Sequence, residues 1–110
     1  MAETLKQIGK VKIGKRFAES IDHAAHTQDG VPLTVPIFRQ SVDEDRAEVR
    51  IYVHFDDSVV GEVAAVQLVD NDGDVVAEAP HTFSKPANKG LYVAFKYGIK
   101  EMEVEAYAGL

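Results

Sequence analysis

The chain has no cysteine and no tryptophan among its 110 residues. Without cysteine it forms no disulfide, thiolate metal site or iron–sulfur cluster, and it has no thiol nucleophile. No apolar run approaches the roughly 18 residues needed to cross a bilayer, and the N-terminal segment lacks the apolar stretch of a signal peptide. We therefore expect no membrane span and synthesis in the cytoplasm.

Sequence patterns that mark catalytic sites are also missing. The chain contains no G-x-S-x-G nucleophile elbow, no glycine-rich phosphate loop and no H-E-x-x-H zinc motif. Neighbouring carboxylates occur at residues 43–45 and 56–57, but a catalytic pair needs an apolar pocket, and these residues lie in predicted polar turns. We expect neither enzymatic activity nor a cofactor.

Negative charge is concentrated in the second part of the chain. Residues 1–42 contain six Lys or Arg and four Asp or Glu, whereas residues 43–110 contain six and fourteen, which gives the formal net charge of −6. An acidic body repels phosphate backbones, so we do not expect nucleic acid as a partner. The one basic cluster, residues 10–16, alternates with apolar residues, which is typical of a strand with a solvated charged face.

A two-residue alternation of apolar and polar side chains dominates the rest of the chain. It is clearest over residues 48–55, and it also predicts strands over residues 31–38, 61–69, 74–79, 91–97 and 100–107. Pro32 and Pro36 restrict the segment of residues 31–38 to a sheet edge or an extended arm. We predict a mainly β fold, an antiparallel β-sandwich or small barrel of six to seven strands. The expected core residues are Val49, Ile51, Val53, Phe55, Val66, Leu68, Leu91, Val93, Phe95, Met102 and Val104.

Helical patterns are confined to the beginning of the chain. Residues 16–26 place Phe17 and Ile21 on one helical face for about two turns, and residues 1–9 can form about one turn more. We interpret residues 1–30 as an arm or embellishment that holds a short helix. Residues 31–110 then form the β-core of a single domain, residues 1–110.

Three alternating aspartates, Asp70, Asp72 and Asp74, resemble the start of a calcium-binding loop. Such a loop also needs a glycine at position 6 and a glutamate at position 12, where this chain has Val75 and His81. The dipeptide formed by Asp72 and the glycine after it is instead a strong signal for a two-residue type I′ hairpin. We favour the hairpin, with Val69 opposite Val76 and Leu68 opposite Ala77, over the metal site.

The histidines are weaker candidates. His23 and His26 are three residues apart on the predicted helix, with Asp22 or Asp29 nearby, but two histidines without a third defined ligand are common on surfaces. His54 lies on the polar face of its predicted strand, where a solvated or cross-strand-paired imidazole is favoured over a general base.

Three segments carry a family resemblance: MAETLKQIGKVKIGKRFAESID, VVGEVAAVQLVDNDGDVVAE and FSKPANKGLYVAFKY. They resemble small accessory proteins encoded beside the tail and baseplate genes of tailed phages and prophages of Gram-positive bacteria. Proteins of this group are sometimes called ketopantoate hydroxymethyltransferase, but 110 residues are too few for the (β/α)₈ barrel of that enzyme, for which about 250 are typical. The resemblance implies an accessory protein made in the host cytoplasm, with the virion as a further location.

Two hypotheses of function follow. In the first, the protein is a structural or assembly component that forms a homo-oligomer, with the interface at Leu5, Ile8, Phe17, Val31, Leu33, Val35 and Ile37. In the second, it is a binding module for a carbohydrate or another cell-surface ligand that stacks on Tyr52, Tyr92 and Tyr97. We favour the first hypothesis, because tyrosines on a small sandwich more often cap the core.

Overall fold

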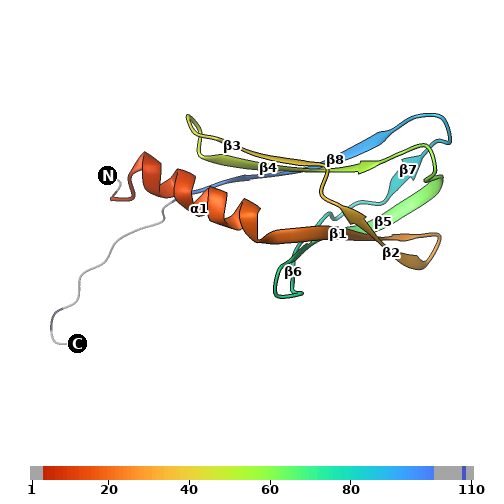
Figure 1. Ribbon diagram of the computed structural model, residues 1–110, viewed down its shortest axis with the longest axis horizontal. Coiled ribbons are helices and arrows are strands. Elements are labelled where there is room, and N and C mark those ends of the chain that lie inside the picture. The colour runs from red at the N-terminus through yellow and green to blue at the C-terminus, as the bar shows by residue number, and fades with distance from the viewer. Residues whose placement is uncertain (1–3, 101–107, 109–110) are drawn as a thin grey trace.

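The computed structural model describes residues 4–100 and residue 108. One helix is followed by eight antiparallel strands in two facing sheets, without a closed barrel (Figure 1). The mainly β prediction is thus confirmed, although the described part alone has more strands than the six to seven expected. The elements are α1 (Gln7–Ser20), β1 (Ile21–Gln28), β2 (Val31–Pro36), β3 (Arg39–Asp43), β4 (Glu48–Phe55), β5 (Gly61–Asp70), β6 (Val75–Glu78), β7 (Phe83–Lys85) and β8 (Leu91–Gly98).

The larger sheet has the order β2-β1-β5-β6, with β7 also paired to β5, and the smaller sheet has the order β3-β4-β8. The core fills the space between them, and the alternating apolar residues of β4 are at most 1% exposed. Of the predicted core residues, Leu91 is half-buried, and Met102 and Val104 lie outside the described part. The others are buried as predicted: Val49, Ile51, Val53, Phe55, Val66, Leu68, Val93 and Phe95.

Helix α1 includes the basic cluster for which we predicted a strand. Its buried residues, Val11, Gly14 and Ala18, are spaced three and four apart, as on one face of a helix. A Cβ atom at Gly14 would lie 2.8 Å from Cγ2 of Val49, so glycine allows the helix to approach β4 closely. The strand prediction was wrong because a helical stripe that includes glycine and alanine has little apolar character in the sequence.

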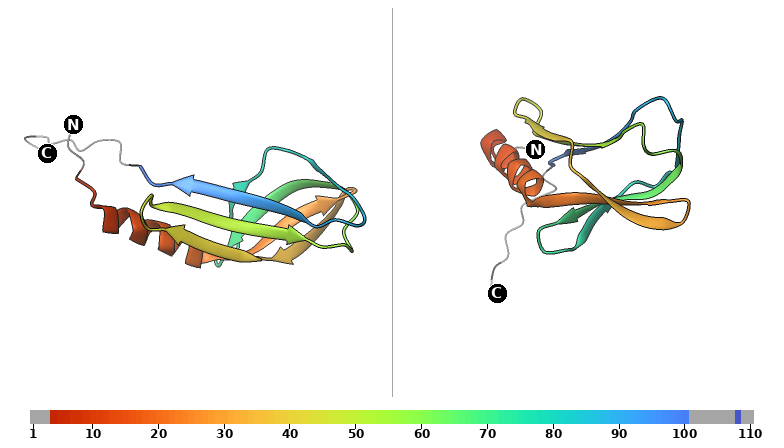
Figure 2. Two further views of the ribbon diagram at one scale, coloured as in Figure 1. Left: turned by 90° about the horizontal axis from the view of Figure 1, so that it is seen from above. Right: turned by 45° about the vertical axis from the view of Figure 1, so that its right-hand side comes forward.

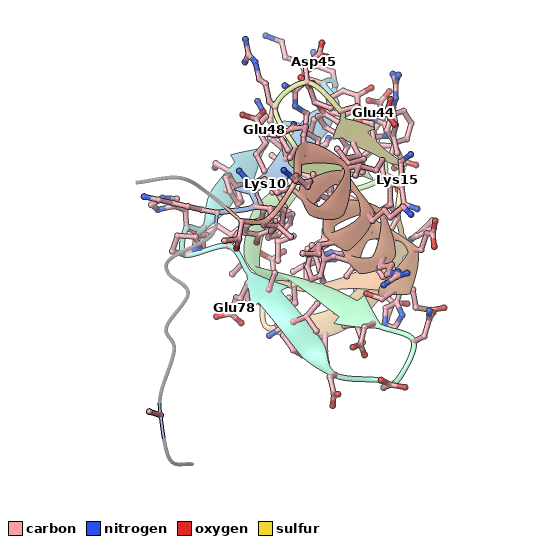
Figure 3. All side chains as sticks on the ribbon, turned by 90° about the vertical axis from the view of Figure 1, so that its left-hand side faces the viewer. Lys10, Lys15, Glu44, Asp45, Glu48 and Glu78 are labelled. Atoms are coloured by element: carbon pink, nitrogen blue, oxygen red, sulfur yellow. The ribbon has the colours of Figure 1, made fainter. Side chains whose placement is uncertain are left out.

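Helix α1 extends the long dimension of the two sheets (Figure 1), and Lys15 lies beside Glu44 at one end of the molecule (Figure 3). Lys15 Nζ lies 3.0 Å from Oε1 of Glu44, and Gln7 Nε2 donates to the backbone carbonyls of Glu44 and Asp45. These contacts attach the helix to the turn between β3 and β4. Helix α1 has fourteen residues and is the one helix among the described residues. It does not meet the length and hydrophobicity that a membrane-spanning helix needs.

The predicted helix over residues 16–26 ends at Ser20, and the next segment is strand β1. Strand β1 pairs with both β2 and β5, and Ala24 is fully buried. Residues 21–28, which we assigned to the arm, therefore form a strand within the larger sheet. Asp29 and Gly30 have φ of 50° and 84° and connect Gln28 to its partner Val31, the geometry that an Asp-Gly hairpin turn requires.

The loop between β5 and β6 differs from the two-residue turn that we predicted. Gly73 N–H donates to the carbonyl of Asp70 at 3.0 Å, and Asp70 N–H donates to the carbonyl of Asp74 at 2.9 Å. Gly73 has a φ of 86°, whereas Asp72 is not among the positive-φ residues. This is a three-residue connection with a bulge at the glycine rather than a type I′ turn.

The register between β5 and β6 follows from that loop. Leu68 lies opposite Ala77, as predicted, but Val69 lies opposite Val75 rather than Val76. The pairing shifts between these two positions, because a bulge sets two residues of one strand against one residue of its partner.

Strand β2 lies at an edge of the larger sheet, as its two prolines predict. Backbone amides alternate between the two sides of a strand, so Pro32 and Pro36 lack a donor on the same side. Strand β2 pairs with β1 along its whole length, so the amides on the side that faces β1 are needed for that pairing. The side on which the two prolines lack an amide is therefore the outer edge of the sheet. Only Thr34 retains an outward amide between the prolines, which limits the addition of a further strand by backbone hydrogen bonds.

Candidate functional site

Three aromatic rings meet on the outer face of the smaller sheet, the face seen in the left view of Figure 2. The ring centroids of His54 and Tyr92 are 4.4 Å apart at an interplanar angle of 30°. The Phe38 ring lies 5.2 Å from His54 and 5.5 Å from Tyr92. We call these three side chains the aromatic cluster. Phe38 and Tyr92 are 55% and 57% exposed, so the cluster presents ring surface to solvent.

The strand register brings these rings together. Strand β4 buries every second residue, so Arg50, Tyr52 and His54 face outward. The pairing of β4 with β8 sets His54 directly opposite Tyr92. Phe38 N–H donates to the carbonyl of Tyr52 at 3.0 Å, which extends the pairing of β3 with β4 by one residue and places the Phe38 ring beside the other two.

A shallow cavity of about 450 Å³ adjoins the aromatic cluster. It is lined by Phe38, Arg39, Ser41, Arg50, Tyr52 and Tyr92. The polar side chains in this lining are guanidinium groups and hydroxyls, all of which donate hydrogen bonds. No carboxylate is among the residues that line the cavity.

The two arginines of the cavity have different surroundings. Arg50 Nη2 lies 3.1 Å from Oε1 of Glu48 and 3.6 Å from Oδ2 of Asp43, and the hydrogen bond with Glu48 raises the pKa of Arg50. Arg39 is exposed and has no ion-pair partner among the residues that the structure describes. Arg39 is therefore the cation that remains available to a ligand.

The three tyrosines that we singled out do not form one surface. Tyr52 and Tyr92 line the same cavity. Tyr97 lies opposite Val49 in the register and so points to the inner side of the sheet, where its ring centroid is 5.9 Å from that of Phe17. Burial against the helix raises the pKa of Tyr97. The structure thus separates Tyr97 from the cavity.

We did not predict Phe38 and Arg39 as members of this surface, and we assigned His54 no ligand role. The available signal was the pair of aromatic rings, Tyr52 and His54, on the polar face of a strand whose other face is apolar. The contribution of Phe38 had no such signal, because it depends on how β3 pairs with β4.

The structure also brings together the aspartates of the rejected calcium loop. One carboxylate oxygen from each of Asp70, Asp72 and Asp74 lies within 4.8 Å of the others. Oδ1 of Asp70 accepts the backbone N–H groups of Asp72 at 3.0 Å and Asp74 at 2.9 Å. Such bonds stabilise a turn, so the turn by itself accounts for the position of Asp70.

We expect calcium to leave the melting temperature of chelator-treated protein unchanged, and Asp72→Asn to make no difference to this result. A ligand present at 100 times its dissociation constant would add about 2.7 kcal/mol of stability, which differential scanning fluorimetry readily detects. A rise of several degrees in calcium that disappears in Asp72→Asn would instead establish a metal site in this turn.

His26 lies inside the core. It is 5% exposed, its ring centroid is 4.8 Å from that of Phe55, and neither ring nitrogen has a hydrogen-bond partner in the described part. Burial lowers the pKa of His26. His23 faces the opposite side of the strand, with Nδ1 at 2.8 Å from Asp22, so the two histidines share no face.

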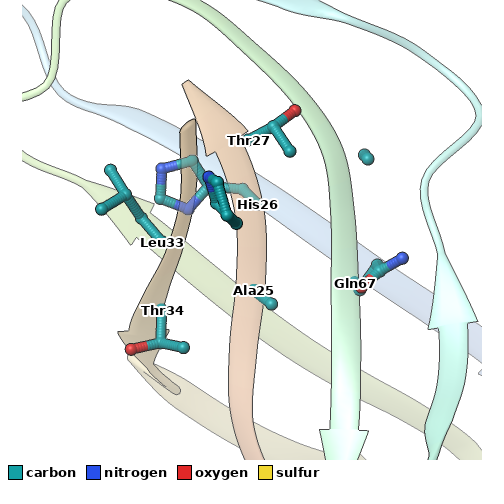
Figure 4. A pocket seen from close by; sticks show the side chains of 8 residues that line it. Ala25, His26, Thr27, Leu33, Thr34 and Gln67 are labelled. Atoms are coloured by element: carbon teal, nitrogen blue, oxygen red, sulfur yellow. The ribbon is translucent and has the colours of Figure 1, made fainter. Parts of the chain in front are cut away.

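A second shallow groove, of about 410 Å³, crosses the larger sheet (Figure 4). Its side-chain lining includes Ala25, Thr27, Thr34 and Gln67, which are small or uncharged. His26 also borders it, but its ring packs against Phe55 between the sheets. His26 is thus the one ionisable residue among those that line the groove.

The predicted interface residues fall into two groups. Phe17, Val35 and Ile37 pack against the core, and Leu5 is half-buried. Ile8, Val31 and Leu33 are 60%, 55% and 43% exposed. Val31 and Leu33 are therefore not buried within one chain.

Comparisons with known proteins identify no relative: no protein-family model matches the chain, and no curated protein or solved structure is significantly similar to it.

Proposed function

We propose that this protein is a non-enzymatic assembly protein that acts through protein–protein contacts, and that it associates first with a second copy of itself. The observation that carries the proposal is an apolar layer that continues from the core onto β2 and is uncovered there. The resemblance to tail-associated accessory proteins supports this role and suggests a phage tail as the setting.

Register defines the uncovered layer. Residues directly opposite each other in an antiparallel pair share a face, and Val35, Leu33 and Val31 lie opposite Ala24, His26 and Gln28 of β1. Ala24 is fully buried and His26 is 5% exposed, whereas Leu33 and Val31 are 43% and 55% exposed. The face that is core on β1 therefore becomes solvent-exposed surface on β2.

A second copy of the chain can cover this layer and gain free energy from the burial of its apolar side chains. Full burial of a Val or Leu side chain contributes about 1.5–3 kcal/mol relative to exposure. In a dimer with a two-fold axis beside β2, both copies of Val31 and of Leu33 would be buried, so each residue would contribute once in each subunit. Since the outer edge of β2 has few amide donors, we expect side-chain packing rather than a continuous intermolecular sheet to hold the copies together.

We expect the full-length protein to be oligomeric at tens of micromolar and the double variant Val31→Asp/Leu33→Asp to be monomeric. Both side chains are already partly exposed, so the buried charge that the substitutions create exists only in the interface. Light scattering coupled to size-exclusion chromatography measures the mass of each species, and thermal unfolding shows whether the variant remains folded.

Val75→Asp is the matched control, because Val75 is 54% exposed on β6. The order of the larger sheet separates β6 from β2 by two strands. We expect this variant to keep the wild-type mass. A wild-type protein that stays monomeric, or a double variant that stays oligomeric, would contradict the proposed interface on β2.

A further inference from the structure

We propose that the outer face of the smaller sheet is a binding site for an anionic saccharide, a sugar ring that carries a carboxylate or phosphate group. The site consists of the aromatic cluster together with Arg39 and Tyr52. It is independent of the assembly surface on β2, and it would let an assembled particle hold a charged glycan.

The aromatic cluster supplies a stacking platform. Phe38 and Tyr92 expose more than half of their surfaces, and both contact His54. Because the His54 and Tyr92 rings are stacked on neighbouring strands, their planes are held before a ligand arrives, which lowers the entropy cost of binding. Aromatic faces of this kind accept the apolar C–H face of a sugar, while the Tyr92 hydroxyl remains at the wet end of its ring.

The cavity beside the cluster supplies selectivity for an anion. Its side-chain polar groups are the guanidinium groups of Arg39 and Arg50 and the hydroxyls of Ser41, Tyr52 and Tyr92. Arg50 is engaged with Glu48 and Asp43, whereas Arg39 is exposed and unpaired in the described part of the chain. A guanidinium group binds a carboxylate or phosphate in a bidentate manner, so Arg39 would bind the charged group of a sugar whose ring lies on Phe38 and Tyr92.

Charge favours a small glycan over nucleic acid as the ligand. The chain has a formal net charge of −6, and affinity for a phosphate backbone requires many Lys and Arg contacts. The cavity offers one unpaired arginine, and Lys96 is the next exposed cation on the same face, opposite Arg50. One or two cations suit a single charged sugar better than a polyanion.

A set of sugars that share one ring tests the proposal. We expect glucuronate or glucose 6-phosphate to shift the backbone amide NMR signals of Phe38, Arg39, Tyr52 and Tyr92, and neutral glucose to bind at least about tenfold more weakly. The two charged sugars separate a carboxylate from a phosphate ligand. A thymidine oligonucleotide tests the competing nucleic-acid ligand.

Substitutions assign the interaction to residues. We expect Tyr92→Ala and Arg39→Gln each to weaken binding of the charged sugar at least about tenfold, and Arg39→Gln to abolish the preference over glucose. Tyr97→Ala is the matched control: it removes a tyrosine from the same strand on the opposite face, and affinity should stay at the wild-type value. Thermal unfolding of each variant confirms that the protein is folded, and Arg39→Gln tests the site even if Tyr92→Ala unfolds.

Three results would overturn the proposal. One is the absence of binding by either charged sugar, and another is equal binding of glucose, which would show that Arg39 has no role. The third is tighter binding of the oligonucleotide than of either sugar, which would make the surface a single-strand nucleic-acid site. If Tyr92→Ala lowers the oligomeric mass while no sugar binds, the aromatic cluster is instead a subunit contact and the saccharide site is rejected.

Discussion

A chain that begins at Arg39 is expected not to fold. It would lack β1, which lies between β2 and β5 in the larger sheet, and with it the buried side chains of Ile21, Ala24 and His26. A domain of this size has about 5–15 kcal/mol of stability in total, and the loss of a central strand exceeds what such a domain tolerates. Circular dichroism should show no cooperative thermal transition for this chain under conditions in which the full-length protein has one.

Fragment complementation provides the control. At residues 37–38 the chain crosses from β2 in the larger sheet to β3 in the smaller sheet. A separate peptide of residues 1–38 can therefore supply α1, β1 and β2. We expect an equimolar mixture of the two fragments to regain a cooperative transition, and the same peptide with Ala24→Asp to fail. A cooperative transition of the shortened chain alone would instead show that residues 1–38 are not needed for folding.

Phe95→Ala is expected to destabilise the protein by about 3–5 kcal/mol, because it leaves a cavity in the centre of the core. Phe95 is 6% exposed and lies opposite fully buried Ile51. Urea denaturation should show a lower midpoint with an unchanged slope. In a domain of this size each kcal/mol corresponds to about 4–8 °C in melting temperature.

Phe38→Ala removes the same side chain from the surface and is the matched control. Phe38 is 55% exposed and contacts the other two rings of the aromatic cluster only at their edges or at a tilt, so we expect a loss of about 1 kcal/mol or less. Equal losses for the two variants would show that Phe95 is not a core residue in solution.

The strands in the second part of the chain were predictable because their period is local. Residues 48–55 and 91–97 alternate without interruption, and the structure places their apolar residues at the interface between the sheets. The edge position of β2 was predictable for an equally local reason. A proline has no amide hydrogen, so it cannot donate the hydrogen bond that a central strand makes to its neighbour. Each of these predictions depends on one segment and one backbone conformation.

The first thirty residues were not predictable in the same way. Residues 10–16 alternate like a strand but form part of α1, which packs on β4 at Gly14. Residues 21–28 resemble the continuation of a helix, but β5 and β2 supply pairing partners on both sides. In both segments tertiary contacts override a weak local preference.

The two Asp-Gly dipeptides illustrate the same limit. Both mark hairpins, as their backbone preference dictates. At Asp29 and Gly30 the turn has two residues, with positive φ at both. At Asp72 and Gly73 the loop has three residues, and only the glycine has positive φ. An Asp-Gly dipeptide thus forms part of a turn at each position, whereas the flanking strand register decides which type of turn forms.

By itself, the sequence determined the absence of cysteine chemistry, the mainly β character and the buried faces of β4 and β8, because composition and the two-residue period can be read without knowing which segments meet. The tertiary structure alone decided where separate segments meet. Phe38, His54 and Tyr92 form one surface, and Val31 and Leu33 remain uncovered, because pairing register and the extent of the facing sheet determine these contacts. Both proposed binding surfaces depend on contacts of this second kind.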